Sequence, residues 1–233
     1  MQRRLGVTVQ PSAILPSIGS KELVSGIPRL LGLPAGSTVV IPRVAYPTYA
    51  VGAVVAGCEY VATDEPETVE GAALVWLNSP GNPTGTVLAP ERAADIVAWA
   101  RETGAVVVSD ECYIELGWDA EPVSVLHPSV CGDSHDGVLA LHSLSKRSNL
   151  AGYRFGFVAG DPALIDDLLA VRKHLGMMVP TPVQHAAIAA FDDDAHVEVQ
   201  KAAYGTRRAV LRGALSAAGF RIDESAAGLY LWI

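Results

Sequence analysis

A lysine and an arginine lie eight residues apart in the sequence Ser-Leu-Ser-Lys-Arg-Ser-Asn-Leu-Ala-Gly-Tyr-Arg, which ends at Arg154. The amine of Lys146 can form a Schiff base with an aldehyde and can then move a proton at a neighbouring carbon. The guanidinium of Arg154 can hold a phosphate through two parallel hydrogen bonds. Ser143 and Ser145, beside the lysine, add two hydroxyl donors. These residue types predict a site for a phosphorylated aldehyde.

Two segments upstream fit the same chemistry. Asp110 follows the apolar run 105–109, and its carboxylate can keep a ring nitrogen protonated by charge attraction. Tyr113 lies three residues further on, and Asn82 lies in the turn sequence Ser-Pro-Gly-Asn-Pro-Thr-Gly. Both side chains can donate a hydrogen bond to an oxygen substituent on such a ring. Asn82 precedes Asp110 by 28 residues, with a helix and strand pattern between them.

A third segment predicts an anion site at the start of a helix. Gly19, Ser20 and Lys21 open a helical pattern, and the free N–H groups and positive dipole end of a helix favour an anion. The glycine also permits close approach of the backbone. Because Gly-Ser alone is equally an ordinary helix start, the segment gains its meaning from the other motifs.

These segments together resemble the pyridoxal-phosphate site of the class I/II aminotransferases, a family of fold type I. The resemblance covers essentially the whole chain. It implies an α/β fold with a mainly parallel, seven-stranded type of sheet between helices, followed by the beginning of a small α+β domain. The implied cofactor is pyridoxal 5′-phosphate (PLP), with Lys146 as the catalytic residue. The residues expected to bind PLP are Gly19, Ser20, Lys21, Tyr46, Asn82, Asp110, Tyr113, Ser143, Ser145, Lys146 and Arg154.

Some of these roles depend on the resemblance alone. Ser143 corresponds to the family's usual phosphate ligand, and Tyr46 to the aromatic residue that stacks on the cofactor ring in this subgroup. We assign Tyr49, three residues after Tyr46, to packing, and we expect His142 to be structural. The resemblance also implies a homodimer, because sites of this fold type are completed across a subunit interface.

One branch of the family is especially similar, the succinyldiaminopimelate aminotransferases of actinobacteria. The motifs Gly-Ser-Lys-Glu, Ala-Tyr-Pro-Thr-Tyr and Trp-Leu-Asn-Ser-Pro-Gly-Asn-Pro-Thr-Gly carry this similarity, and the closing Gly-Leu-Tyr-Leu-Trp agrees with it. The branch implies transamination between N-succinyl-2-amino-6-oxopimelate and glutamate, which gives N-succinyl-LL-2,6-diaminopimelate and 2-oxoglutarate in lysine biosynthesis.

Measured against that branch, we expect both ends of the sequence to be incomplete, without an N-terminal arm and most of the small domain. The arginine that binds the substrate α-carboxylate and the tyrosine that reaches the neighbouring subunit's phosphate have no counterpart here. Three alternatives therefore stay open. They are a fragment that binds PLP but is catalytically impaired, a C–S lyase on the same scaffold, and the sensing domain of a transcriptional regulator.

Composition narrows the class of protein. Half of the residues are hydrophobic, so the chain can bury a sizeable core, and 17 basic against 25 acidic residues argue against a nucleic-acid partner. The three cysteines lack a C-x-x-C spacing and the histidines lack metal-ligand spacing. No apolar run approaches the roughly 18 residues of a membrane span. We therefore expect a cytoplasmic enzyme with small-molecule substrates and no metal.

Short apolar runs alternate with helical patterns, which is typical of a mainly parallel sheet covered by helices. We expect a large domain over residues 1–193 and the start of a small domain over 194–233. The predicted strands are 38–41, 59–63, 73–77, 105–109, 138–142 and 155–159, with two more at 220–223 and 229–233. The predicted helices are 20–33, 48–57, 90–103, 162–174 and 195–218.

Overall fold

The computed structural model describes all 233 residues and is built around a seven-stranded sheet of order β1-β7-β6-β5-β4-β2-β3. Strands β3, β2, β4, β5 and β6 run parallel, whereas β7 is antiparallel to β6 and β1 is antiparallel to β7. The strands are β1 (Ile14–Ser17), β2 (Thr38–Ile41), β3 (Glu59–Ala62), β4 (Ala72–Asn78), β5 (Val106–Asp110), β6 (Val138–Ser143) and β7 (Gly156–Gly160). The mainly parallel α/β sheet expected from the sequence is confirmed.

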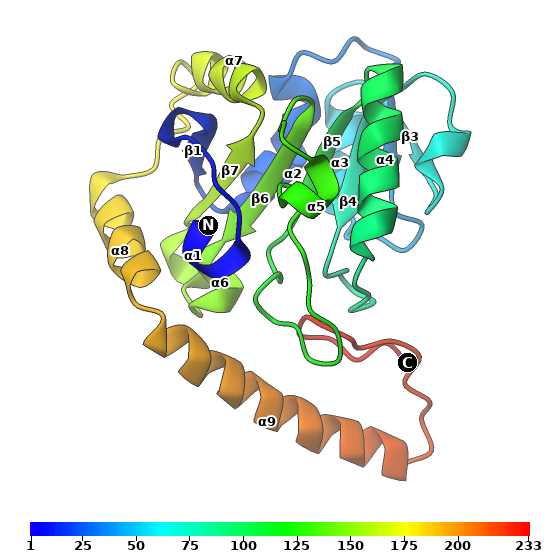
Figure 1. Cartoon of the computed structure of the whole chain (residues 1–233), viewed down its shortest axis with the longest axis vertical. Coiled ribbons are helices and arrows are strands. Elements are labelled where there is room, and N and C mark those ends of the chain that lie inside the picture. The colour runs from blue at the N-terminus through cyan, green and yellow to red at the C-terminus, as the bar shows by residue number, and fades with distance from the viewer.

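Helices cover both faces of this sheet (Figure 1). One buried cluster joins α2, α3 and α7 to the sheet, and the other joins α4, α5 and α8. Strand β5 contributes Val107 to the second cluster and Val108 to the first, both fully buried, because successive side chains of a strand point to opposite faces. The helices are α1 (Gln2–Leu5), α2 (Ser20–Leu30), α3 (Thr48–Val55), α4 (Pro90–Thr103), α5 (Pro128–Cys131), α6 (Leu144–Arg147), α7 (Pro162–Arg172), α8 (Thr181–Asp192) and α9 (Ala195–Ala217).

Helix α4 has the bounds predicted from its end signals. Pro90 occupies the first turn, where its missing N–H costs no hydrogen bond, and Glu91 lies near the positive end of the helix dipole. Gly104 ends the helix in the left-handed conformation, with φ of 77°.

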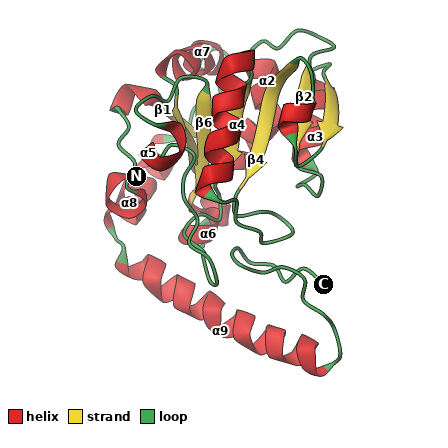
Figure 2. Cartoon of the chain, turned by 45° about the vertical axis from the view of Figure 1, so that its right-hand side comes forward, coloured by secondary structure: helices red, strands yellow, loops and turns green.

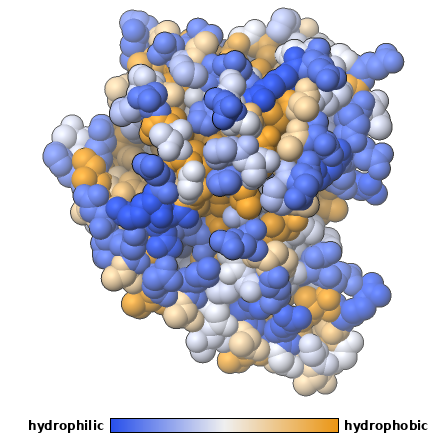
Figure 3. All heavy atoms as spheres, in the orientation of Figure 1, coloured by the Kyte–Doolittle hydropathy of each residue, from blue (hydrophilic) through white to orange (hydrophobic).

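Helix α9 extends away from the sheet, and the chain then returns toward the loop that follows β5 (Figure 2). Figure 3 shows apolar atoms gathered in the middle of one face of the molecule, bordered by hydrophilic atoms. Along α9, the apolar side chains of Val199, Val210 and Leu211 are exposed. No helix has both the length and the apolar character needed to cross a bilayer.

Four elements differ from the sequence prediction. The two predicted strands at 220–223 and 229–233 are wrong, since this region forms only two isolated bridges, one between Glu224 and Trp232 and one between Ala227 and Gly117. An apolar pattern makes a strand only where another strand offers its backbone groups. Strand β1 was not predicted, because it contains Pro16, which a strand tolerates at the edge of a sheet. Helix α8 was also missed.

Candidate cofactor site

Lys146 lies where the sequence places it, directly after the carboxyl end of β6. Ser143 ends this strand and caps α6, because its Oγ accepts a hydrogen bond from the Ser145 N–H at 3.1 Å. The short helix then carries Lys146, which is partly buried, toward the loop after β5. Its Nζ lies 5.9 Å from the centre of the Tyr113 ring. The lysine and Tyr113 therefore face each other at one edge of the sheet.

Asp110 is the last residue of β5 and is buried. Its Oδ2 accepts a hydrogen bond from the Tyr49 hydroxyl at 3.0 Å, and its Oδ1 accepts one from the Cys112 N–H at 3.2 Å. Burial raises the pKa of the Asp110 carboxyl, and the hydrogen bonds from Cys112 and Tyr49 act in the opposite direction. The carboxylate is therefore fixed in orientation and partly desolvated, as a partner for a buried cation would be.

Tyr49 does more than the packing assigned to it. Its ring is fully buried and stacks on Trp76, with ring centres 4.8 Å apart, while its hydroxyl reaches Asp110. The position of Tyr49, one helical turn after Tyr46, is only a weak indication that it binds Asp110, because the sequence does not show which strand end its hydroxyl reaches.

The turn with Asn82 is tied to Asp110 through the neighbouring strand. Asn78 and Asp110 are paired in register at the ends of β4 and β5. The Asn78 side chain accepts a hydrogen bond from the Asn82 N–H at 2.8 Å and donates one to the Asp110 carbonyl oxygen at 3.0 Å. The structure therefore brings Asn82 and Asp110 to the same edge of the sheet, and Asn78 is the link that sequence reasoning missed.

Arg154 and Gly19 meet at the N-terminus of α2. A Cβ atom on Gly19 would lie 2.2 Å from Arg154 Nη2, so only glycine leaves room for the guanidinium. No side chain caps α2, and the only hydrogen bond of the guanidinium goes from Nη1 to the Ala151 carbonyl oxygen at 2.9 Å. Free helix N–H groups and an arginine without an acidic partner form a positive cradle suited to phosphate.

Further contacts join this cradle to the Asp110 side of the site. The Cys112 thiol donates a hydrogen bond to the Ser20 hydroxyl at 3.0 Å. Lys21 extends its amine to 5.4 Å from the centre of the Tyr46 ring, and the Tyr46 ring meets Tyr49 edge-on at 6.0 Å. Every segment predicted to hold PLP thus reaches one region of the sheet edge. The Ser145 hydroxyl makes no hydrogen bond within the chain, whereas its N–H donates to Ser143 Oγ.

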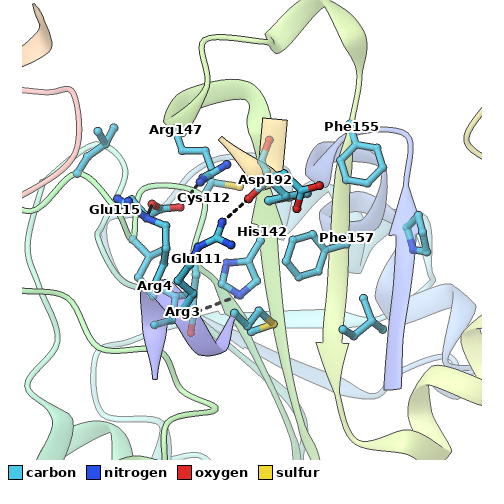
Figure 4. A pocket seen from close by; sticks show the side chains of 18 residues that line it. Arg3, Arg4, Glu111, Cys112, Glu115, His142, Arg147, Phe155, Phe157 and Asp192 are labelled. Carbon is cyan, nitrogen blue, oxygen red and sulfur yellow. Dashed lines mark hydrogen bonds and ion pairs between the residues drawn. The ribbon is translucent and has the colours of Figure 1, made fainter. Parts of the chain in front are cut away.

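A cavity of about 390 Å³ lies beside these residues (Figure 4). It shares Cys112 and Ser143 with them but is not lined by Lys146, Asp110 or Tyr113. Figure 4 shows arginines and Glu115 on one side of the cavity and Phe155 and Phe157 on the other. Because Lys146, Asp110 and Tyr113 lie outside it, the cavity is a neighbour of the candidate site.

Two buried ionisable groups face each other in this cavity. Glu111 Oε2 and His142 Nε2 are 3.4 Å apart, and neither atom has a hydrogen-bond partner. Burial raises the pKa of Glu111 to about 7 and lowers the pKa of His142 to about 3. His142 also stacks on Phe157, with ring centres 4.9 Å apart. The structural role expected for His142 agrees with this packing.

The residues present fit PLP. The Gly19–Arg154 contact leaves an anion cradle, a buried carboxylate ends β5, and a lysine faces the Tyr113 ring. No group of three or more His, Cys, Asp or Glu side chains is arranged to hold a metal ion.

Comparisons with known proteins agree with this geometry. The chain is 58% identical over its whole length to 4-dedimethylamino-4-oxo-anhydrotetracycline transaminase of Streptomyces rimosus, and 57% identical to a probable aminotransferase of Mycobacterium tuberculosis. It spans 65% and 56% of these relatives.

Solved structures give the same result. An aminotransferase of Neisseria meningitidis is 29% identical, with a TM-score of 0.89 over 99% of this chain and 63% of its own. A probable N-succinyldiaminopimelate aminotransferase of Thermus thermophilus is 26% identical, with a TM-score of 0.88 over 99% of this chain and 65% of its own. The sequence profile of the class I and II aminotransferases matches residues 1–233, so the chain belongs to this PLP-dependent family.

Proposed function

We propose that the protein of this chain is a transaminase that moves an amino group between an amino acid and a 2-oxo acid. The observation that carries the proposal is that three groups lie on segments at the same end of the sheet, linked through the Cys112–Ser20 hydrogen bond and the contact of Lys146 with Tyr113. These are the amine of Lys146, the buried carboxylate of Asp110 and the Arg154 guanidinium over Gly19. An amine, an acid and an anion cradle are what PLP chemistry requires of a protein.

Each residue has a distinct role in this proposal. When bound, PLP supplies an aldehyde that joins the lysine amine and a ring that accepts electrons. Arg154, Ser20 and Ser143 bind the phosphate, and Asp110 holds a proton at the ring nitrogen. Asn82 and Tyr113 donate hydrogen bonds to the phenolic oxygen, and Tyr46 packs on the ring. The amine of Lys146 moves the proton at the substrate α-carbon.

For the substrate, we propose N-succinyl-LL-2,6-diaminopimelate with 2-oxoglutarate as the amino acceptor, in lysine biosynthesis. The motifs shared with that branch support the assignment, as does the name of the Thermus thermophilus structure. The relative from Streptomyces rimosus is named for an anhydrotetracycline ketone, which gives a second candidate, transamination of a polycyclic ketone.

Three further assignments belong to this proposal. The large domain ends at residue 193, because α8 ends at Asp192 and α9 begins at Ala195, and limited proteolysis between the two helices tests that boundary.

The protein is a homodimer, which sedimentation of the PLP-bound protein tests. Its location is the cytoplasm, because all three cysteines are free thiols, and fractionation of cells tests it.

The activity test uses PLP-loaded protein and single turnovers. We expect glutamate to bleach the visible absorbance of bound PLP, and N-succinyl-LL-2,6-diaminopimelate to bleach it faster than diaminopimelate or amino-tetracycline substrates. The Lys146→Ala variant should lose this reaction, whereas Lys173→Ala, at an exposed lysine, should keep it. Yellow protein that no amino acid bleaches would contradict transaminase activity, and ammonia with pyruvate from cystathionine would favour a lyase.

A further inference from the structure

Tyr113 has an aromatic partner that the sequence motifs do not include. The hydroxyl of Tyr230 lies 3.3 Å from the Tyr113 hydroxyl, and the two rings meet edge-on with centres 6.1 Å apart. Tyr113 is buried, whereas Tyr230 is 39% exposed. Since Lys146 Nζ lies 5.9 Å from the centre of the Tyr113 ring, Tyr113 contacts both the lysine and Tyr230.

Tyr230 belongs to the segment 225–230, which we name the C-terminal strap and which hydrogen bonds attach to the rest of the fold. The Gly228 N–H donates to the Leu116 carbonyl oxygen at 2.8 Å, and the Trp118 indole donates to the Gly228 carbonyl oxygen at 2.7 Å. These bonds attach the strap to the loop that carries Tyr113. The backbone two residues before Tyr230 is therefore attached at both its N–H and its carbonyl oxygen.

The strap also reaches the turn that carries Asn82. The Ala227 N–H donates to the Gly85 carbonyl oxygen at 2.9 Å. Gly85 has φ of 72°, and a Cβ atom there would lie 2.7 Å from the Ala227 carbonyl oxygen, so glycine is required for this approach. The strap thus joins the two loops whose side chains we assign to the phenolic oxygen of PLP.

We propose that Tyr230 is a positioning residue for Tyr113, an inference that rests on the proposed function. In this proposal the Tyr230 hydroxyl is the donor to the Tyr113 oxygen, which leaves the Tyr113 proton to point at the phenolic oxygen of the cofactor. Donors linked in this way strengthen each other. Through Tyr113, Tyr230 stabilises the negative phenolic oxygen and so lowers the pKa of the Schiff base between Lys146 and PLP.

The test is a pH titration of the visible absorbance of bound PLP in the full chain. Tyr230→Phe keeps the ring and removes only the hydroxyl. We expect it to raise the apparent pKa of the lysine–PLP Schiff base by about half a unit to one unit. Tyr113→Phe should raise it further, and the double variant should match Tyr113→Phe. The control is Tyr204→Phe, which removes a tyrosine hydroxyl that donates to Asn149 at 3.3 Å; it should leave the apparent pKa unchanged.

The outcomes separate this inference from the proposed function. Bound PLP with an unchanged apparent pKa in Tyr230→Phe overturns the inference and leaves the proposed function standing. A Tyr230→Phe shift that persists in the Tyr113→Phe background also overturns it, since Tyr230 would then act by another route. Wild-type protein without PLP on Lys146 overturns both.

Discussion

The guanidinium of Arg154 lies in the space that a side chain on Gly19 would fill, 2.2 Å from the Cβ position. This contact places a positive charge directly over the uncapped N-terminus of α2. Glycine is therefore required at position 19 for two reasons: any side chain would collide with Arg154, and φ is 72°. The relationship makes the phosphate cradle testable apart from the lysine.

Gly19→Ala should displace Arg154 and weaken PLP binding by about 10- to 100-fold, since hydrogen bonds to charged groups contribute roughly 1.5–3 kcal/mol. The measurement is the Kd of PLP from absorbance titration of the apo protein. Gly32→Ala is the matched control, because Gly32 has φ of 70° and no atom within 4 Å of its Cβ position. Equal PLP affinity in the two variants would mean that Arg154 does not hold the phosphate.

Tyr49→Phe tests the hydrogen bond to Asp110. Burial already raises the pKa of Asp110, and loss of the Tyr49 hydroxyl removes a bond that lowers it. We therefore expect the acidic limb of the pH–rate profile to move to higher pH and the rate at neutral pH to fall about 10-fold. Single turnovers with glutamate across pH measure both. A uniform decrease at every pH would show that Tyr49 contributes only packing, and Tyr60→Phe, at an exposed tyrosine, is the control.

Glu111 should make stability depend on pH. Burial raises its pKa from 4.5 to about 7, so the folded protein keeps a proton that the unfolded chain releases. The contribution of the Glu111 proton to stability is fully present below pH 4.5 and is lost as pH rises through about 7, a total loss on the order of 3 kcal/mol. Relative to Glu111→Gln, the wild-type free energy of unfolding should therefore fall between pH 4.5 and 7.

Urea unfolding of both proteins across that pH range measures the difference. Glu121→Gln, at an exposed glutamate, is the control and should follow the wild type. A constant difference between wild type and Glu111→Gln would mean that Glu111 is charged in the folded protein. Both proteins keep His142, whose pKa burial lowers to about 3. The histidine makes the free energy of unfolding rise with pH, and taking the difference between the two proteins removes this effect.

The sequence predicted the parts of the site that follow from strand ends and helix starts. Lys146, Asp110 and Asn82 lie at, or within four residues after, the ends of buried apolar strands, so their convergence follows from a parallel sheet, whose strands end at one edge. The bounds of α4 follow from Pro90 and Gly104. These features depend on residues close together in the sequence.

What the sequence could not predict depends on contacts between distant segments. The Tyr49 hydroxyl meets an aspartate 61 residues away, and Tyr230 meets a tyrosine 117 residues away. The region 220–233 has the apolar residues of strands but lacks a neighbouring strand to pair with, so the prediction of two strands there was wrong. Strand β1 contains a proline, which argues against a strand in the sequence, but the strand lies at the edge of the sheet, where a proline is tolerated.

The most direct test of the central claim is borohydride reduction of the PLP-loaded chain followed by peptide mapping. A reduced Schiff base remains attached to the lysine that formed it, so the label identifies the amine. The proposed function predicts one labelled peptide, with the label on Lys146, and no label in Lys146→Ala. A label on another lysine, or none in the wild-type chain, would contradict it.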